Sequence, residues 1–404
     1  MTGTGIGTKE SPFTPGRPVP VEYFIARKQE IERLKRAMMQ TAAGRNENIF
    51  ITGERGIGKS SLAGLSRYLA EKEYGLLGVH CFLSGTKSLE DVTRTIFQRL
   101  LEECGDKSVF DKLKGIFGGY IKGVTLFGVG VEFTDDKSEL RGLLDNFLPI
   151  LRKIYEQVKE NNKKGVIIVL DDLNGITELP EFSQFLKSFV DSIATSNNPL
   201  PLLLVLVGIP ERRADLLKYQ PSVARIFDIV ELPLMSKDES REFFTNMFAK
   251  QMIDVDEKAI SLMVELSGSY PMLMHEVGDA VFWQDTDSRI DIVDAKLGIM
   301  EAAKIVGRKY IGTQISSVFR SKVYSSILMQ IGEKLPIGAT FKRQELLKEN
   351  APEKEQKNLD NFLKKVKKLG IMGDAETRGE YKFVNPLYHL YMWYEAKNVK
   401  ELKD

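Results

Sequence analysis

An octapeptide near the start of the chain constrains its fold more than any other feature. Residues 53–60 read Gly-Glu-Arg-Gly-Ile-Gly-Lys-Ser, which fits the pattern G-x-x-x-x-G-K-[ST]. The apolar run over 48–52 predicts a strand before it, and the residues over 59–73 predict a helix after it. Glycine lets backbone N–H groups turn inward, and a helix N-terminus is positively polarised. The sequence therefore predicts a strand, a phosphate-binding loop and a helix in succession.

The residue types of this loop suit a nucleoside triphosphate. The Lys59 ammonium is predicted to reach the β- and γ-phosphates, and the Ser60 hydroxyl to ligate Mg²⁺. The other predicted nucleotide contacts from the loop and the first helical turn are Gly53, Glu54, Arg55, Gly56, Ile57, Gly58 and Ser61. ATP or ADP with Mg²⁺ are thus the expected cofactors. A glycine turn that binds no ligand is the alternative.

A pair of aspartates follows a second apolar strand, about a hundred residues later. Five aliphatic residues over 166–170 end in Asp171 and Asp172. This pattern fits the second element of a P-loop protein, so Asp171, at the C-terminal end of the strand, is predicted to hold Mg²⁺ through water. Asp172 is predicted to polarise the attacking water as general base. The alternative for Asp172 is a solvated carboxylate in a turn.

Further aliphatic runs predict the fold class. They are strands buried on both faces, and they alternate with helical patterns, so we expect an α/β fold with a parallel sheet. The predicted strands are 76–83, 202–207 and 226–232, and the predicted helices are 27–39, 88–103 and 140–160. Glycines interleaved with apolar residues over 117–133 predict a β-hairpin inserted at about 115–135. A segment that touches a membrane is the alternative for this stretch.

The strand pattern stops after Pro233. Helices are predicted over 236–310, with breaks at 268–271 and near 285–291. The final stretch then predicts the elements of a winged helix: helices over 323–331, 341–348 and 353–369, a hairpin over 371–384 and a last helix from Pro386. The expected organisation is a flexible leader over 1–20, a phosphate-binding core over 21–235, a helical lid over 236–316 and a winged-helix domain over 317–404.

Composition narrows the class of protein. Of 404 residues, 43% are hydrophobic and 28% charged, which is the balance of a soluble globular protein of two or three domains. The longest apolar run, Leu202–Val207, is too short to cross a bilayer, so no membrane partner is expected. Cys81 and Cys104 form neither a disulfide framework nor a metal motif, which favours the cytoplasm. His80, in an apolar strand, is predicted to be a core residue rather than a ligand.

The stretch over 24–34 looks like the opening box of AAA+ and STAND ATPases. It reads Phe24-Ile25-Ala26-Arg27-Lys28-Gln29-Glu30-Ile31-Glu32-Arg33-Leu34. The order of the motifs also resembles that superfamily: opening box, Walker A at 53–60, Walker B at 166–172, a strand ending at 207–210, a lid and a winged helix. The chain is similar to archaeal and bacterial ATPases that resemble origin-recognition proteins, and to STAND switches. The resemblance implies that Phe24, Ile25 and Arg27 flank the adenine.

The sequence departs from the usual AAA+ pattern at several positions. Ala26 replaces the glycine of the opening box, and Asp172 stands where most AAA+ motors have glutamate. An Asp-Asp pair resembles STAND proteins, which often hydrolyse slowly and act as switches. The position of the polar sensor falls near Glu211, which is not a usual sensor. Pro271, in Gly-Ser-Tyr-Pro, resembles the STAND proline near adenine and ribose, although a proline that only begins a helix has the same sequence.

An arginine before the last core strand has a counterpart in AAA+ proteins. The resemblance implies that Arg225 is a catalytic arginine finger for a neighbouring subunit, and hence a homo-oligomer. Arg212 and Arg213 are weaker candidates for the same role. A surface arginine without function is the alternative.

The C-terminal part is modestly basic. From residue 317 onward the chain has 17 Lys+Arg against 12 Asp+Glu. Lys364, Lys365, Lys367 and Lys368 crowd the end of the predicted recognition helix and could contact the phosphates of double-stranded DNA. Cations are also favoured at any helix C-terminus, and in STAND relatives this module binds a protein.

The motifs together predict a slowly hydrolysing ATPase that acts as a nucleotide-dependent molecular switch. A DNA-binding initiator or loader, and an adaptor that controls a separate effector protein, are the alternatives.

Overall fold

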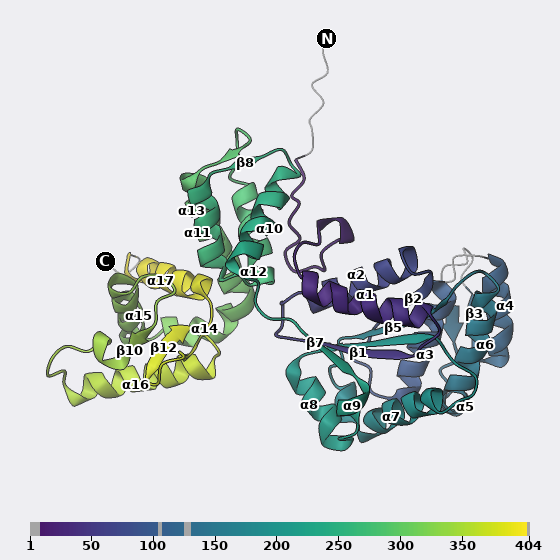
Figure 1. The fold of residues 1–404 in the computed structure, drawn as a ribbon. Helices are drawn as coiled ribbons and strands as arrows, with labels where there is room; N and C mark the ends of the chain where they lie inside the picture. Colours follow the sequence, from purple (N-terminus) through teal and green to yellow (C-terminus); the bar gives the residue numbers. More distant parts are fainter. Residues whose placement is uncertain (1–8, 104–106, 125–130, 402–404) are drawn as a thin grey trace, which may run out of the picture. The chain divides into compact units, whose positions relative to one another are not determined.

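The computed structural model describes residues 9–103, 107–124 and 131–401 (Figure 1). These residues divide into two compact units. The core unit comprises residues 18–233, and the second unit comprises residues 234–404 together with the chain up to Arg17. Within the described residues, no helix has the length and apolarity needed to cross a membrane.

A five-stranded sheet of order β2-β5-β6-β1-β7 forms the centre of the core unit, and all of its neighbouring strands are parallel. The α/β fold with a central parallel sheet is thus confirmed. β5 and β6 are buried along their whole length, as the aliphatic runs predicted. The strands are β1 (Glu47–Thr52), β2 (Leu76–Phe82), β5 (Gly165–Asp171), β6 (Leu202–Gly208) and β7 (Asp228–Glu231).

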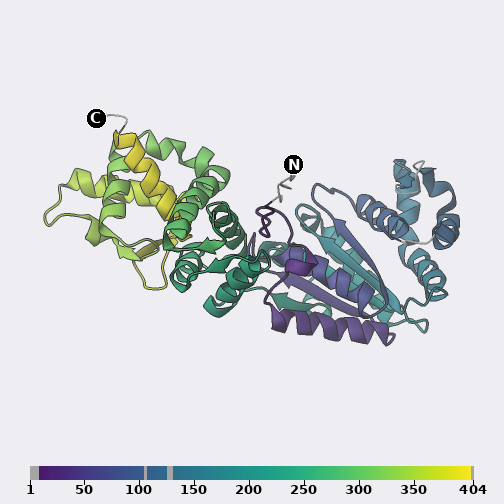
Figure 2. The ribbon, with the colours of Figure 1, turned by 90° about the horizontal axis from the view of Figure 1, so that it is seen from above.

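Helices cover both faces of this sheet (Figures 1 and 2). One face carries α1 (Lys28–Ala42) and α2 (Lys59–Lys72). The other face carries a hydrophobic cluster, to which Cys81, Leu170 and Leu204 contribute from three neighbouring strands. Its helices include α3 (Leu89–Glu102), α6 (Phe147–Lys159), α7 (Pro180–Ala194) and α8 (Pro210–Tyr219).

The region between β2 and β5 differs in detail from the prediction. β3 (Ile121–Val124) and β4 (Val131–Phe133) pair antiparallel, so the hairpin is present, and its residues 125–130 lie outside the described part. Phe117, expected in the hairpin, instead ends a helix that the sequence did not predict, α4 (Lys107–Phe117). The single helix expected over 140–160 is two, α5 (Lys137–Asp145) and α6, because the chain breaks at Asn146.

The first part of the second unit is helical. Its helices are α10 (Lys237–Ala249), α11 (Glu257–Ser267), α12 (Pro271–Phe282), α13 (Ile292–Val306), the π-helical η4 (Gly307–Ile311) and α14 (Gly312–Phe319). The expectation that strands end at Pro233 was wrong. β8 (Asp254–Val255) and β9 (Arg289–Ile290) form a short parallel pair within the helical region.

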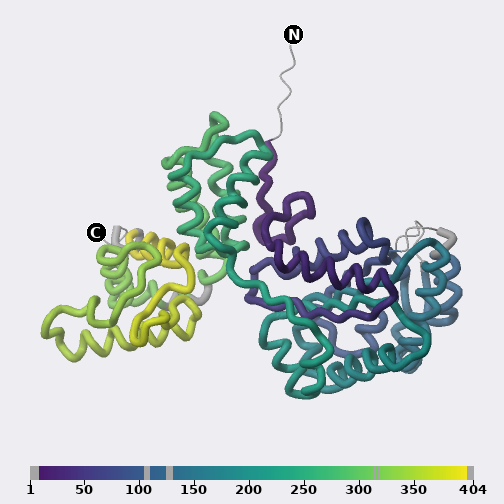
Figure 3. The backbone as a smooth tube through the Cα atoms, in the orientation of Figure 1, coloured from purple at the N-terminus to yellow at the C-terminus, as the bar shows by residue number. Residues whose placement is uncertain are grey.

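The N-terminal segment 9–17 belongs to this unit, and its path beside α10 and α12 can be followed in Figure 3. Phe13 is 4% exposed, and its ring centroid lies 5.0 Å from that of Phe248. The Thr14 N–H donates to His275 Nδ1 at 3.1 Å. Burial lowers the pKa of His275 to about 4, so the ring is neutral at pH 7 and can accept this hydrogen bond. The flexible leader expected over 1–20 is therefore corrected for residues 9–17.

A second feature shows how closely this segment fits. A methyl group added at Gly278 on α12 would lie 2.2 Å from a carbon of the Phe13 ring. Only a residue without a side chain therefore leaves room for Phe13 at this position. The Lys9 ammonium lies 2.8 Å from the Asp285 carboxylate and fixes the segment at its outer end.

The last part of the second unit combines helices with a three-stranded antiparallel sheet of order β10-β12-β11. Its elements are α15 (Lys322–Lys334), β10 (Phe341–Lys342), the 3-10 helix η5 (Arg343–Leu346), α16 (Glu353–Lys368), β11 (Met372–Asp374), β12 (Glu380–Phe383) and α17 (Pro386–Glu401). The helix expected over 341–348 was wrong, because Phe341 pairs with Tyr381 in the sheet. That this part of the chain is a winged helix stays a prediction.

Candidate functional site

The glycine-rich loop lies between the C-terminal end of β1 and the start of α2. Gly53, Gly56 and Gly58 have φ values of 148°, 77° and 100°, which glycine adopts readily. A Cβ atom at Gly53 would lie 2.9 Å from the Leu232 carbonyl oxygen, so this position also has no room for a side chain. The loop therefore has the backbone shape that brings successive N–H groups and the N-terminus of α2 to one anion.

Lys59 folds back over the same loop. Its Nζ donates to the carbonyl oxygens of Gly53, at 2.8 Å, and Glu54, at 2.7 Å. Burial lowers the pKa of the Lys59 ammonium from its ordinary value, and the negative charge of Asp171 acts in the opposite direction. The ammonium is thus partly desolvated and lies within electrostatic reach of the second motif, which suits a phosphate ligand between them.

Asp171 ends β5 and is 2% exposed. Its Oδ1 accepts the Asp172 N–H at 2.8 Å, and its Oδ2 lies 3.1 Å from His80 Nε2. Asp172 has a φ of +56°, and its half-buried side chain contacts the Asn174 amide. The two carboxylates therefore differ: Asp171 is fixed between two donors, and Asp172 lies at the turn that follows the strand.

The residues present fit a magnesium nucleotide. The described residues contain no group of three or more His, Cys, Asp or Glu that could hold a metal by itself. A hydroxyl, Ser60, lies in the first turn of α2, and one buried carboxylate, Asp171, lies at the same edge of the sheet. Mg²⁺ is usually held by one or two such groups together with phosphate oxygens and water. Ser60 and Asp171 are the residues that would hold it.

Residues 24–27 lie beside the phosphate loop, and Arg27 supports the loop through a hydrogen bond. Arg27 is 3% exposed, and its Nη2 donates to the Ile57 carbonyl at 3.3 Å. Ala26 and Arg27 have φ values of 70° and 64°, a left-handed conformation that glycine adopts more readily than either residue. The Arg27 side chain thus supports the loop instead of facing open solvent. Phe24 and Ile25 are half-buried beside it.

Ser61 has a similar supporting role. Its hydroxyl is buried and accepts the Val19 N–H at 3.0 Å. A contact from Ser61 to a phosphate would therefore come from its backbone N–H in the first turn of α2.

The predicted arginines have different surroundings. Arg225 lies on α9 (Val223–Ile226), is exposed, and forms no ion pair among the described residues. Arg212 Nη1 instead lies 2.7 Å from a Glu178 oxygen and 3.2 Å from an Asp215 oxygen, so it is held within the core unit. Arg225 is the one of these two that is not already paired.

Two predicted positions have simpler surroundings. Pro271 begins α12 in the second unit, after Gly268 and Ser269, whose φ values are 62° and 56°. Glu211 is exposed in the first turn of α8. Neither position shows a feature specific to nucleotide binding.

The four lysines at the end of α16 do not form one surface. Lys367 Nζ lies 2.7 Å from an Asp374 oxygen, and Lys365 Nζ lies 5.6 Å from the centre of the Tyr324 ring. Lys364 and Lys368 are exposed, and they continue a line of exposed residues at alternating helical spacings of three and four. We call this line the basic stripe: Lys354, Lys357, Asn361, Lys364 and Lys368.

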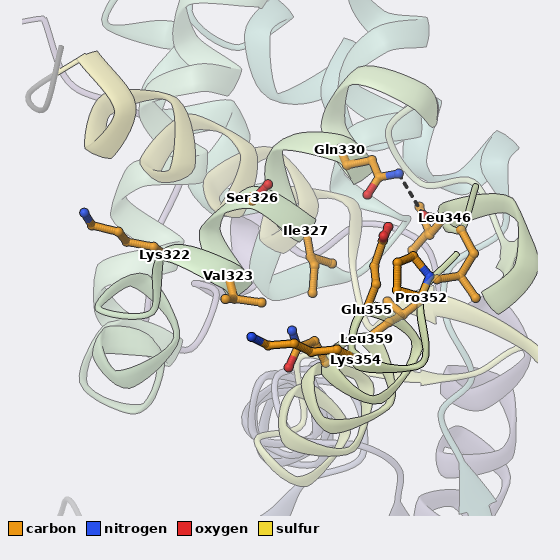
Figure 4. Close-up of a pocket in the computed structure, with 12 residues that line it drawn as sticks. Lys322, Val323, Ser326, Ile327, Gln330, Leu346, Pro352, Lys354, Glu355 and Leu359 are labelled. Carbon is orange, nitrogen blue, oxygen red and sulfur yellow. Dashed lines mark hydrogen bonds between the residues drawn. The ribbon is translucent and has the colours of Figure 1, made fainter. Parts of the chain in front are cut away.

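A pocket of about 500 Å³ lies in the second unit, between α15 and the start of α16 (Figure 4). Val323, Ile327 and Leu359 line its apolar part, and Lys322 and Lys354 lie at its edge. The Gln330 side chain donates to the Leu346 carbonyl at 2.7 Å and holds the η5 turn beside it. None of its residues belongs to the phosphate loop, so it is separate from the nucleotide site.

Sequence reasoning missed the position of His80, which was assigned to the core. The parallel register places His80 beside Val169 and Phe82 beside Asp171, so these four side chains share one face of the sheet. The available signal was a polar residue two positions before the end of a strand that is otherwise apolar. It could not be used without knowing that β2 and β5 are neighbours.

Comparison with known proteins agrees with this geometry. Residues 23–205 match the family of AAA ATPase domains. The fold is similar to that of the ORC2 protein of Aeropyrum pernix in its ADPNP-ADP complexes, with a TM-score of 0.55, 12% identity, and coverage of 98% of this chain and 97% of that one. The Walker-type ATPase PABY2304 of Pyrococcus abyssi is similar with a TM-score of 0.49, 18% identity, and coverage of 92% and 96%. No curated protein matches the chain.

Proposed function

We propose that this chain is a P-loop ATPase of the AAA+ class that works as a slowly hydrolysing molecular switch, because residues 23–205 match the family of AAA ATPase domains. The observation that carries the proposal is the joint placement of Lys59 and Asp171. The fold brings a partly desolvated ammonium and a nearly buried carboxylate to one edge of the sheet. In such a pair, the ammonium can bind the phosphates and the carboxylate can hold the hydrated Mg²⁺ of a magnesium triphosphate.

In this proposal the chain's own residues divide the work. The loop N–H groups and Lys59 bind and orient the phosphates, and Asp172 accepts the proton of the attacking water. Bound Mg²⁺ would neutralise charge on the phosphate oxygens. Because the side chain of Asp172 is one methylene shorter than the glutamate of AAA+ motors, we infer slow turnover. Phe24, Ile25 and Pro271 are proposed to contact the adenosine, and Arg225 to act on a neighbouring copy.

A switch must differ between its nucleotide states. We expect the amide hydrogens of residues 234–401 to exchange at different rates in the ADP complex and in a complex with a non-hydrolysable ATP analogue, because the nucleotide would change how the second unit is held. Hydrogen exchange read by mass spectrometry measures this, with the nucleotide-free protein as reference. Identical exchange of these residues in both complexes, with exchange of the phosphate loop slowed, would reject the switch while leaving the ATPase assignment intact.

One observation favours a second candidate, an ATPase that binds duplex DNA. The basic stripe lies on the exposed face of α16, which occupies the recognition position if this domain is a winged helix. Four lysines separated by three, seven and four residues along one helix face can follow a phosphate backbone.

Neutralising the stripe tests this candidate. We expect glutamine at Lys354, Lys357, Lys364 and Lys368 to weaken binding to all duplexes alike, because phosphates carry no base information. The log–log salt slope should flatten by up to about 0.9 for each lost contact. Glutamine at Lys365 and Lys367 is the matched control, since these two lysines already have intramolecular partners. Equal losses in the stripe and control variants would contradict the assigned surface.

A further inference from the structure

We propose that His80 is a positioning residue for Asp171, holding its carboxylate in the orientation that a hydrated Mg²⁺ needs. The inference rests on the proposed function in one respect, namely that Asp171 holds the metal. It adds a residue that belongs to neither nucleotide motif and lies on a different strand.

The register of the sheet brings His80 close to Asp171. Phe82 lies beside Asp171 and His80 beside Val169, so His80 and Asp171 project from the same face of neighbouring strands. The distance from His80 Nε2 to Asp171 Oδ2 is 3.1 Å, within hydrogen-bonding range. An ionised carboxylate only accepts hydrogen bonds, so the proton of this bond must be on Nε2.

The histidine ring is itself held in place. It stacks on the Phe82 ring, with the two centroids 4.5 Å apart and the planes at 21°. The His80 side chain is 10% exposed. Because packing limits rotation of the ring, its N–H has a defined direction toward the carboxylate.

The carboxylate is consequently fixed at both oxygens. Oδ1 accepts the Asp172 N–H at 2.8 Å, and Oδ2 accepts from His80. Each oxygen can accept a second hydrogen bond through its other lone pair, which leaves one site on each for a metal-bound water. Without His80, Oδ2 would lose its donor, and rotation of the carboxylate would be restrained at one oxygen only.

Partners that orient a metal-binding side chain have a measurable effect. Removing one commonly costs about 10- to 100-fold in metal affinity. A histidine that only fills space in the core would behave differently: its loss would lower stability and leave metal binding unchanged. The two readings therefore differ in metal affinity, not in whether a variant folds well.

The test is a Mn²⁺ titration of the full-length protein in complex with ADP, in which electron paramagnetic resonance reports the free metal. We expect His80→Leu, which cannot donate a hydrogen bond, to weaken Mn²⁺ binding by about 10- to 100-fold. Affinity for a fluorescent ADP analogue in the presence of EDTA should not change. Wild-type Mn²⁺ affinity in a folded His80→Leu protein would overturn the inference.

Two amide variants keep the test decisive if His80→Leu does not fold. The side-chain amide introduced by His80→Gln would reach the position of Nε2, whereas the shorter side chain introduced by His80→Asn would not. We therefore expect His80→Gln to bind Mn²⁺ nearly as tightly as wild type and His80→Asn to bind it more weakly. Equal affinities for the two variants would also overturn the inference.

Asp171→Asn separates this inference from the proposed function. If Asp171→Asn leaves Mn²⁺ affinity unchanged, Asp171 does not hold the metal, and that part of the proposed function fails. If Asp171→Asn weakens Mn²⁺ binding while His80→Leu does not, the proposed function stands, and only the role of His80 is rejected.

Discussion

Replacing Lys59 by alanine is expected to abolish tight ATP binding while the fold remains intact. The Lys59 ammonium lies over the loop, where it donates to the carbonyl oxygens of Gly53 and Glu54 and is partly desolvated. A hydrogen bond to a charged group contributes about 1.5–3 kcal/mol, and this ammonium can donate to both the β- and γ-phosphates. We therefore expect the dissociation constant for ATP to rise by more than about 100-fold.

Isothermal titration calorimetry with ATP and Mg²⁺ measures this change. Lys72→Ala is the matched control, because Lys72 is an exposed lysine at the other end of the same helix. Circular dichroism and the unfolding transition should be nearly the same for both variants. An unchanged ATP affinity in a well-folded Lys59→Ala protein would show that the loop does not bind nucleotide as assigned.

The change Asp172→Asn is expected to separate binding from turnover. If Asp172 accepts the proton of the attacking water, its amide counterpart should hydrolyse ATP about 10²- to 10⁴-fold more slowly and bind it equally well. The backbone supports this choice of substitution. Asp172 has a φ of +56°, a conformation that asparagine adopts more readily than most residues, so the turn should be preserved.

Single-turnover hydrolysis, measured with protein in excess over ATP, separates the chemical step from product release. Asp191→Asn, an exposed change of the same kind on α7, is the control. Full turnover by the Asp172→Asn protein would place the general base elsewhere.

Local signals explain why the core of the site could be predicted from the sequence. The phosphate loop is eight consecutive residues, and that spacing predicts the roles of the glycines, Lys59 and Ser60. β5 and β6 could be predicted equally well, because strands buried on both faces must be continuously apolar. In each case the residues of one short segment are enough to predict its structure.

Features that depend on distant contacts could not be predicted in this way. Phe341 was assigned to a helix, yet it forms a strand because Tyr381 lies beside it in the sheet. His80 and Asp171 are 91 positions apart, and their contact depends on β2 lying next to β5. Neither sheet partner can be identified from the local sequence pattern.

The N-terminal segment shows that amino-acid composition also fails to predict structure that depends on distant contacts. A segment rich in glycine, proline and threonine predicts mobile chain, although it also contains the aromatic residue Phe13. Its burial depends on the space left by Gly278, on a helix more than 260 residues away. The sequence shows the apolar residue but not the cavity that receives it.

The docking of residues 9–17 has a consequence for the order in which the protein is built. Phe13 and Thr14 belong to a unit whose other members are synthesised last, and the Thr14 partner His275 comes 261 residues later. During translation the whole core unit leaves the ribosome first and can fold as a domain inserted into an unfinished host. Residues 9–17 can pack only after α12 has been synthesised, by which time the core unit can already have folded. A fragment that begins at residue 234 would lack Phe13 and would carry a permanent void between α10 and α12.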